Sequence, residues 1–253
     1  MNRLDTVFEL NKPLLNIFIT AGYPKLDSLP KLAKSLLIKG VDVIEVGMPY
    51  SDPLADGPII QNASAIAIEN GITVSIIFDQ IKEIRALNNS TPILLMGYFN
   101  QILQVEVESF LKQCQQVGVD GLIIPDLPYD VYIEHYQSLF EKYKITISFL
   151  ITPQTADARI HALDAACSAF LYIVSDNSLT GSKSDGFSEV QLAYFKRIKA
   201  LNLKSSTMIG FGISSKEMVV EANKYSNGAI IGSAYIEAIR NNIEADFIEQ
   251  LTS

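Results

Sequence analysis

Two carboxylates stand out in the segment IEVGMPYSDPLADGP, residues 44–58. Glu45 lies inside an apolar run, and Asp56 follows it in a segment that contains three prolines. A glutamate that is poorly solvated has a raised pKa, which suits it to transfer protons near neutral pH. A carboxylate held in a stiff loop can accept a hydrogen bond from a substrate N–H group. The pair therefore predicts acid–base chemistry at Glu45 and recognition of an N–H group by Asp56.

Each acid also has a structural interpretation. Asp56 could be a turn or N-cap residue ahead of a helix that starts near Pro58, and the residues alone leave this alternative open. Glu45 could be a structural glutamate paired with a cation. The cations predicted to lie near strand ends are few, and they are Lys12, Lys25 and Lys183.

Eight short apolar runs could position these acids. They are continuous rather than alternating, which is typical of parallel strands buried on both faces. On such a strand, Glu45 points to the opposite face from Ile44 and Val46, and we expect that face to be the interior. The runs cover residues 14–20, 41–47, 91–97, 119–125, 145–151, 169–175, 206–212 and 227–232.

Helical patterns lie between most of these runs. Residues 28–40 and 107–118 each have an apolar stripe and end in glycine, and 59–87 reads as two helices broken near Gly71. About eight strand–helix units predict an α/β fold, a (β/α)8 TIM barrel that occupies residues 1–253 as a single domain. Additional helical segments are expected at 1–10 and 244–252. The alternative is an open, doubly wound sheet.

Glycines mark the ends of the last two predicted strands. Gly210, Phe211 and Gly212 precede a helix expected to begin near Ser214, and Gly232–Ser233 opens another. Backbone N–H groups at two adjacent helix N-termini could bind a phosphate, and barrels commonly place a phosphate there. The alternative is that these glycines only form tight turns. The turn at 180–186 could close over the phosphate as a lid.

Composition excludes several classes of protein. The 253 residues carry a net charge of −8, which argues against a nucleic-acid binder. The N-terminus has no signal-peptide pattern, and the longest apolar runs are too short to cross a membrane. Two cysteines without CxxC spacing suggest a reducing, cytoplasmic location. No His/Cys/Asp cluster has the spacing of a metal site.

The segment IEVGMPYSDPLADGP closely resembles the signature of the tryptophan synthase alpha chain family. The resemblance extends over essentially the whole chain. The other matching segments are FITAGYP (18–24), PILLMGYFN (92–100), GLIIPDLP (121–128), FLITPQT (149–155), YIVSDNSLTG (172–181), GFGIS (210–214) and GAIIGSAYI (228–236).

The resemblance implies a lyase of L-tryptophan biosynthesis. Members of this family cleave indole-3-glycerol phosphate to indole and glyceraldehyde 3-phosphate, a retro-aldol reaction without a metal or organic cofactor in this chain. Glu45 matches the general acid/base that protonates indole C3 and takes the proton of the side-chain hydroxyl. Asp56 matches the carboxylate that holds the indole N–H.

Further residues match substrate-binding positions of the family. Asp126 and Tyr98 match other strand ends, and we expect Asp126 to organise loops by hydrogen bonding. The lid segment departs from the family, because many members have Arg and Gly where this chain has Asp176 and Ser178. The matching substrate-binding positions are Phe18, Met96, Tyr172, Thr180, Gly181, Gly210, Phe211, Gly212, Gly232 and Ser233.

The resemblance also implies a partner, the beta chain, which binds pyridoxal phosphate and receives indole inside an α2β2 heterotetramer. Residues 49–58, 98–104 and 125–132 would face it. Two alternatives remain: another phosphosugar barrel enzyme, and a regulatory or scaffold subunit that binds a phosphorylated ligand without chemistry. The presence of both Glu45 and Asp56 argues against each of them.

Overall fold

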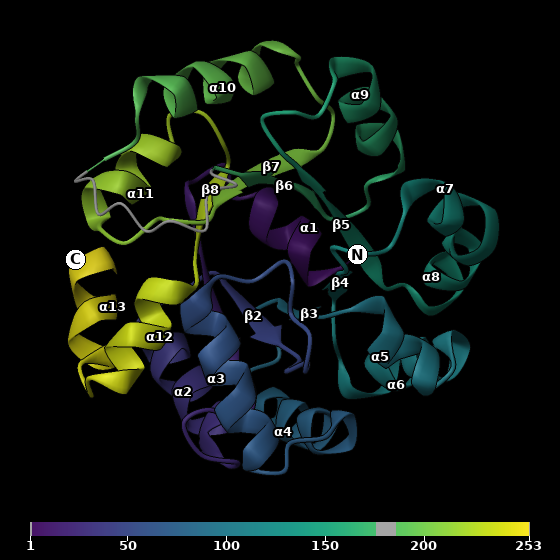
Figure 1. Ribbon diagram of the computed structural model, residues 1–253, viewed down its shortest axis with the longest axis vertical. Helices are drawn as coiled ribbons and strands as arrows, with labels where there is room; N and C mark the ends of the chain where they lie inside the picture. Colours follow the sequence, from purple (N-terminus) through teal and green to yellow (C-terminus); the bar gives the residue numbers. More distant parts are fainter. Residues whose placement is uncertain (1, 176–185, 253) are drawn as a thin grey trace.

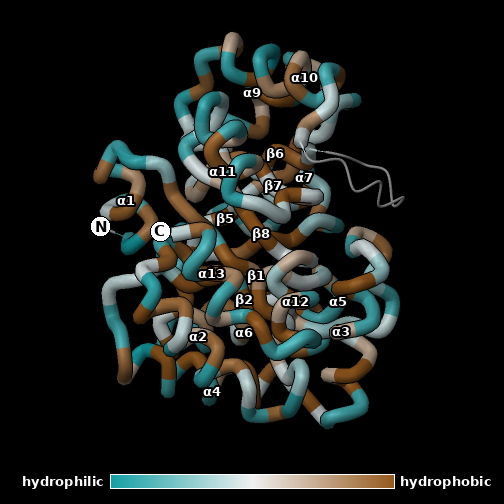
Figure 2. The backbone as a smooth tube through the Cα atoms, turned by 90° about the vertical axis from the view of Figure 1, so that its left-hand side faces the viewer, coloured by the Kyte–Doolittle hydropathy of each residue, from teal (hydrophilic) through white to brown (hydrophobic). Residues whose placement is uncertain are grey.

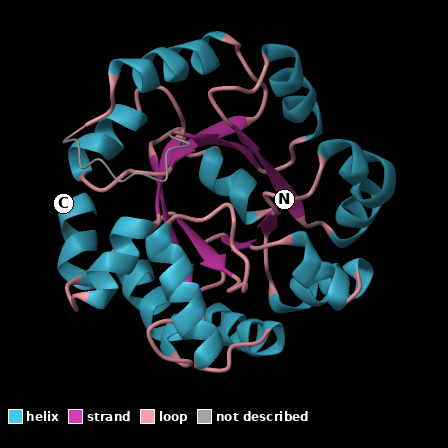
Figure 3. Cartoon of the chain, viewed as in Figure 1, coloured by secondary structure: helices cyan, strands magenta, loops and turns pink. Residues whose placement is uncertain are grey.

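The eight predicted strands form a closed, parallel barrel in the order β1 to β8, so the (β/α)8 prediction is confirmed and the open sheet is excluded. The computed structural model describes residues 2–175 and 186–252. Figure 3 shows the strands at the centre, surrounded by helices. The strands are β1 (Leu14–Thr20), β2 (Val43–Gly47), β3 (Ile93–Met96), β4 (Gly121–Ile123), β5 (Thr146–Ile151), β6 (Phe170–Val174), β7 (Ser206–Gly210) and β8 (Gly228–Ile231).

Helices follow the strands around the barrel (Figure 1). The break near Gly71 separates two helices, as the sequence predicts. None of the helices in the described part of the chain is long and apolar enough to cross a bilayer. The principal helices are α1 (Arg3–Phe8), α2 (Ser28–Ile38), α3 (Pro58–Glu69), α4 (Val74–Leu87), α6 (Val107–Val117), α9 (Asp157–Ala166), α10 (Glu189–Ala200), α11 (Lys216–Ala222), α12 (Ser233–Arg240) and α13 (Glu244–Thr252).

Two helical features differ from the sequence prediction. Helix α5 (Phe99–Gln104) lies where only a strand end is expected, and at its start Oε1 of Gln101 accepts the backbone N–H of Tyr98 at 3.1 Å. The segment 131–143 reads as one helix, but a π-helical turn (Tyr132–Tyr136) separates α7 (Tyr129–Val131) from α8 (Gln137–Tyr143). Both elements are short, and apolar periodicity gives little signal over one or two turns.

The strands bring apolar side chains into the core from both faces. Every residue of β1, β2, β3, β4, β6 and β8 is buried. Figure 2 shows hydrophobic segments in the barrel and hydrophilic ones concentrated on the surrounding helices. A strand buried on both faces has no place for charge unless the charge has a function or a partner, which makes the position of Glu45 informative.

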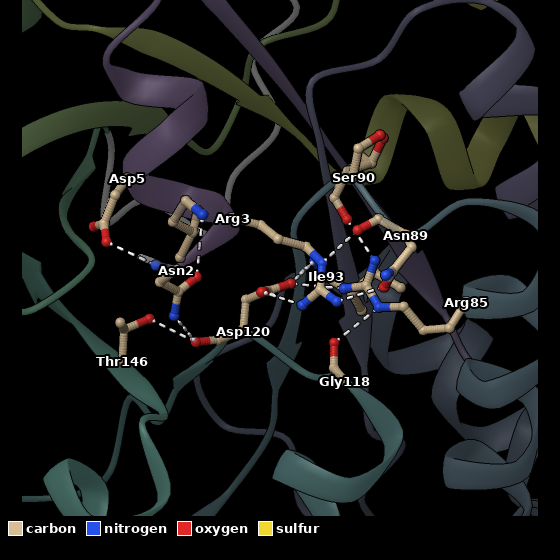
Figure 4. Close-up of polar contacts among 12 residues, drawn as sticks. Asn2, Arg3, Asp5, Arg85, Asn89, Ser90, Ile93, Gly118, Asp120 and Thr146 are labelled. Carbon is tan, nitrogen blue, oxygen red and sulfur yellow. Dashed lines mark hydrogen bonds and ion pairs between the residues drawn. The ribbon is translucent and has the colours of Figure 1, made fainter.

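Helix α1 covers the end of the barrel where the strands begin. Figure 4 shows that Asp120, just before β4, accepts hydrogen bonds from Arg3 at 2.9 Å and Arg85 at 2.6 Å. The Asn2 side chain donates to the Asp120 carbonyl, and Phe8 packs against Phe170. These contacts join α1 and α4 to the base of β4, so this end of the barrel is closed by structural interactions.

Candidate active site

Glu45 points into the barrel from the middle of β2 and is 1% exposed. Its register partner on β1 is Phe18, and the amide Nδ2 of Asn16 donates a hydrogen bond of 2.9 Å to its Oε2. Burial raises the pKa of Glu45 to about 8, while the Asn16 hydrogen bond lowers it and the charge of Asp56 raises it further. A carboxyl group with this pKa can donate and accept a proton near neutral pH.

The structural interpretation of Glu45 requires a cation, and the described residues supply none. Lys12 forms an ion pair of 2.5 Å with Asp42 instead. No ion pair in the described part of the chain involves Lys25 or Glu45. Lys183 lies outside the described residues. The geometry therefore favours an acid–base role over a buried salt bridge.

Asp56 lies in the loop after β2, and it is 9% exposed. The hydroxyl of Tyr98 donates to its Oδ2 at 3.3 Å, and that hydroxyl accepts the N–H of Ala55 at 2.8 Å. Burial raises the pKa of Asp56 to about 6, against the lowering effect of the Tyr98 hydrogen bond. Helix α3 starts at Pro58 with Gly57 as its N-cap, so Asp56 is not the N-cap. Asp56 does lie in a turn, because its N–H donates to the Pro53 carbonyl at 3.1 Å.

A narrow pocket is lined by Asp56 and by two of the predicted substrate-binding residues, but Glu45 and Tyr172 are not among its lining residues. Phe18, Met96 and Pro125 are among the residues that line it. The walls are mostly apolar, which suits a flat aromatic ring with one polar edge. The complete lining is Phe18, Gly47, Met48, Asp56, Ile60, Ser64, Met96, Gly97, Tyr98 and Pro125.

Tyr172 approaches the acids from β6 and is buried. Burial raises the pKa of its hydroxyl, and the charges of Glu45 and Asp56 raise it further. Its ring meets that of Phe211 edge-on, with centroids 5.8 Å apart. A Cβ at Gly210 would lie 2.3 Å from the Tyr172 hydroxyl, so only glycine fits at this strand end. These contacts bring Tyr172, Gly210 and Phe211 together.

The glycine-rich ends of β7 and β8 lie on neighbouring strands. Gly212 has a φ of +72°, in the left-handed region that favours glycine. Helix α11 begins at Lys216, two residues later than expected, because Ser215 is its N-cap. A Cβ at Gly232 would lie 3.6 Å from Cβ of Phe18, which places the start of α12 beside the pocket.

Ser233 is the first residue of α12. The first N–H groups of a helix have no partner within the helix, so they are available to an anion. The remaining predicted lid positions, Thr180 and Gly181, lie outside the described residues, as do Asp176 and Ser178.

Residues 4–251 match the family model described as tryptophan synthase alpha chain. The chain belongs to this family. A tryptophan synthase alpha chain of Flavobacterium psychrophilum is 50% identical over 242 residues, which cover 96% of this chain and 95% of the relative. The alpha chain of Christiangramia forsetii is 52% identical over 242 residues, with coverage of 96% and 94%.

Solved structures of the family have the same fold. The crystal structure of tryptophan synthase subunit alpha from Legionella pneumophila matches with a TM-score of 0.89 and 30% identity, covering 100% of this chain and 97% of that one. A chain of M. tuberculosis tryptophan synthase, described in its aminoacrylate-bound form, matches with a TM-score of 0.87 and 26% identity over 100% and 98% of the two chains. The structural match therefore agrees with the sequence match over the full barrel.

Sequence reasoning missed one buried polar residue next to the acid. Asn16 is the only polar residue of β1 before Thr20, in the run LLNIFIT. An amide side chain in an otherwise apolar strand is the feature of the sequence that could have pointed to it. The sequence also gives no sign of the link between Tyr98 and Asp56, although Tyr98 lies at a predicted strand end. Asp126 accepts the N–H of Phe99 at 2.8 Å, a contact of the kind expected for a residue that organises loops.

Proposed function

We propose that Glu45 and Asp56 carry out the reaction of this family, the cleavage of indole-3-glycerol phosphate to indole and glyceraldehyde 3-phosphate. The observation that supports this most strongly is the pair of buried carboxyls with different raised pKa values, about 8 for Glu45 and about 6 for Asp56. Near pH 7, Glu45 then holds a proton while Asp56 is ionised. One carboxyl is an acid and the other an anion, which is the division of roles that the cleavage needs.

The proton balance needs only these two groups. Glu45 donates its proton to C3 of the indole, which leaves a positive charge on the ring and an N–H group that Asp56 accepts. The Glu45 carboxylate then takes the proton of the hydroxyl next to C3 as the carbon–carbon bond breaks. The electrons of that bond return to the ring, the aldehyde forms, and Glu45 regains its proton for the next cycle.

The binding residues divide between the two ends of the substrate. Phe18, Met96 and Tyr172 would contact the indole. The phosphate would bind at the ends of β7 and β8, and a glycine-rich backbone beside the N-terminus of α12 suits such an anion. The positions proposed for the phosphate and the closing segment are Thr180, Gly181, Gly210, Phe211, Gly212, Gly232 and Ser233.

The partner of this chain is a tryptophan synthase beta chain, in an α2β2 heterotetramer. An exposed rim at the mouth of the barrel supports the predicted contact surface. Leu54 is 87% exposed in the loop that carries Asp56, and Tyr50 stacks on Tyr98 with ring centroids 5.0 Å apart. Apolar and aromatic side chains at a rim are typical of a protein interface.

Pyridoxal phosphate belongs to the beta chain, and we propose that the alpha chain needs no cofactor of its own. Among the described residues, no group of three or more His, Cys, Asp or Glu side chains could hold a metal ion. We also propose a cytoplasmic location, supported by two cysteines that are both free. The assignment of residues 1–253 to a single domain stays a prediction.

Isosteric substitutions test the proposed roles. Glu45→Gln should bind substrate and lose nearly all turnover, because an amide cannot supply the proton. Asp56→Asn should lose much of the rate with less effect on binding. Glu69→Gln, an exposed substitution of the same kind at the end of α3, is the control and should keep full activity. Indole release would be followed with purified chains, and full turnover by Glu45→Gln would refute the acid role.

A further inference from the structure

We propose that Asn16 is a positioning residue for Glu45, holding one carboxyl oxygen from inside the barrel and leaving the other free for proton transfer. This inference rests on the proposed function of Glu45. It adds a residue of β1 that acts through the acid and does not touch the substrate.

The geometry fixes which oxygen is held. Asn16 is fully buried on β1, and its Nδ2 lies 2.9 Å from Oε2 of Glu45. Phe18, two residues further along the strand, is the register partner of Glu45, so Asn16 lies one layer closer to the base of the barrel. In the described part of the chain no other hydrogen bond reaches Glu45. The second oxygen, Oε1, is therefore left for the substrate.

An amide suits an acid that changes its protonation state. A cation at this position would hold Glu45 as a carboxylate and remove its use as an acid. An amide presents both a donor and an acceptor, so Nδ2 can donate to the carboxylate and Oδ1 can accept from the neutral acid. Oδ1 of Asn16 is buried and has no partner among the described residues. Reversal of the amide therefore breaks no other hydrogen bond.

The groups around Glu45 determine in which direction the loss of Asn16 should shift the pKa of Glu45. Two other titratable groups bear on Glu45: Asp56 from the loop after β2, and Tyr172 from β6 across the barrel. The charge of Asp56 and the burial of the site both raise the pKa of Glu45, and the Asn16 hydrogen bond is the one contribution that lowers it. Loss of the amide should therefore make Glu45 a weaker acid that keeps its proton to higher pH.

The test replaces Asn16 with leucine, which has a similar volume and no donor. The alkaline limb of the pH profile of kcat/KM should move up by about one pH unit, because a hydrogen bond to a charged group contributes that order of stabilisation. At pH 7, kcat should fall by about tenfold while KM stays within about twofold. Ser148→Ala is the matched control, because it removes a hydroxyl that is equally buried and unpartnered among the described residues.

A second measurement does not depend on turnover. The infrared band of the protonated carboxyl, identified by its loss in Glu45→Gln, should titrate at higher pH in Asn16→Leu than in the unchanged chain. If Asn16→Leu fails to fold, the smaller Asn16→Ala also removes the N–H donor without adding a charge, and it should shift the band in the same direction.

The outcomes separate this inference from the proposed function. A folded Asn16→Leu chain with an unshifted alkaline limb and an unshifted carboxyl band would overturn the role of Asn16. If Glu45→Gln is inactive in the same experiments, the acid role of Glu45 stands and only the inference about Asn16 fails. Turnover by Glu45→Gln would instead refute the proposed function itself.

Discussion

Replacing Glu45 with glutamine should stabilise the fold, and the gain should grow as the pH rises. Burial raises the pKa of Glu45 from 4.5 to about 8 in the folded chain. Between these values the unfolded chain loses the proton and the folded chain keeps it, so the folded state binds more protons. Its free energy of unfolding therefore falls as the pH rises from about 4.5 to about 8.

The size of the effect follows from the same values. A pKa difference of one corresponds to about 1.36 kcal/mol, so the full difference corresponds to about 5 kcal/mol once the pH exceeds both values. Between pH 5 and pH 8 the change is about 3.5 kcal/mol by the same relation. Glutamine has no proton to lose, and the Asn16 amide can still donate to its carbonyl oxygen, so the variant should not lose this stability.

Urea unfolding followed by far-ultraviolet circular dichroism would measure this effect at pH 5 and pH 8. The advantage of Glu45→Gln over the unchanged chain should be small at pH 5 and several kcal/mol at pH 8. Both chains contain Asp56, so the difference between them reports the replacement of Glu45. An advantage that is equal at both pH values, or a loss that grows with pH, would refute the reasoning.

Three further predictions follow from the site and the base of the barrel. The value of kcat/KM should rise through about pH 6 as Asp56 ionises and fall through about pH 8 as Glu45 loses its proton. Rates of indole release from pH 5 to pH 9 would measure this profile, and a flat profile would contradict the prediction. Ser233→Asp should raise KM by about tenfold or more with little effect on kcat, because the new charge repels the phosphate at the start of α12, and steady-state kinetics would show this. Asp120→Asn should reduce the free energy of unfolding by about 3 kcal/mol in urea, because it leaves buried Arg85 without its ionic partner, whereas Asp27→Asn in an exposed ion pair should cause no measurable change.

The sequence predicts the barrel well, because the pattern that indicates each strand lies within one short segment of the chain. Each strand is a short continuous apolar run, and the pattern alone gives β1 its observed bounds, Leu14–Thr20. Alternation along β2 also predicts correctly that Glu45 faces away from Ile44 and Val46. These features need only the order of residues within one element.

The missed features depend on residues far apart in the chain. The hydrogen bond from Asn16 to Glu45 requires the register of β1 on β2, and apolar patterns do not fix which residues lie opposite each other. The contact of Tyr98 with Asp56 depends on the path of a loop. The closure of the barrel by Arg3 and Asp120 joins residues that are 117 positions apart.

Two interpretations of single residues also needed the structure. The residues alone left the N-cap role of Asp56 open, and the backbone at Gly57 decided against it because the helix has no side-chain cap. For Glu45, the decisive observation is that Lys12 forms an ion pair with Asp42, so Lys12 is not the partner of Glu45. Both questions concern the partners of a charged group, which depend on the folded chain.

The most direct test of the central claim is indole release from indole-3-glycerol phosphate by the purified chain, with and without a beta chain, compared with Glu45→Gln. We expect slow release by the chain alone, much faster release with the beta chain, and almost none from Glu45→Gln under either condition. Equal turnover by the chain and by Glu45→Gln would contradict the assignment of Glu45. Substrate binding without release in every case would indicate a subunit that binds the phosphorylated ligand but does no chemistry.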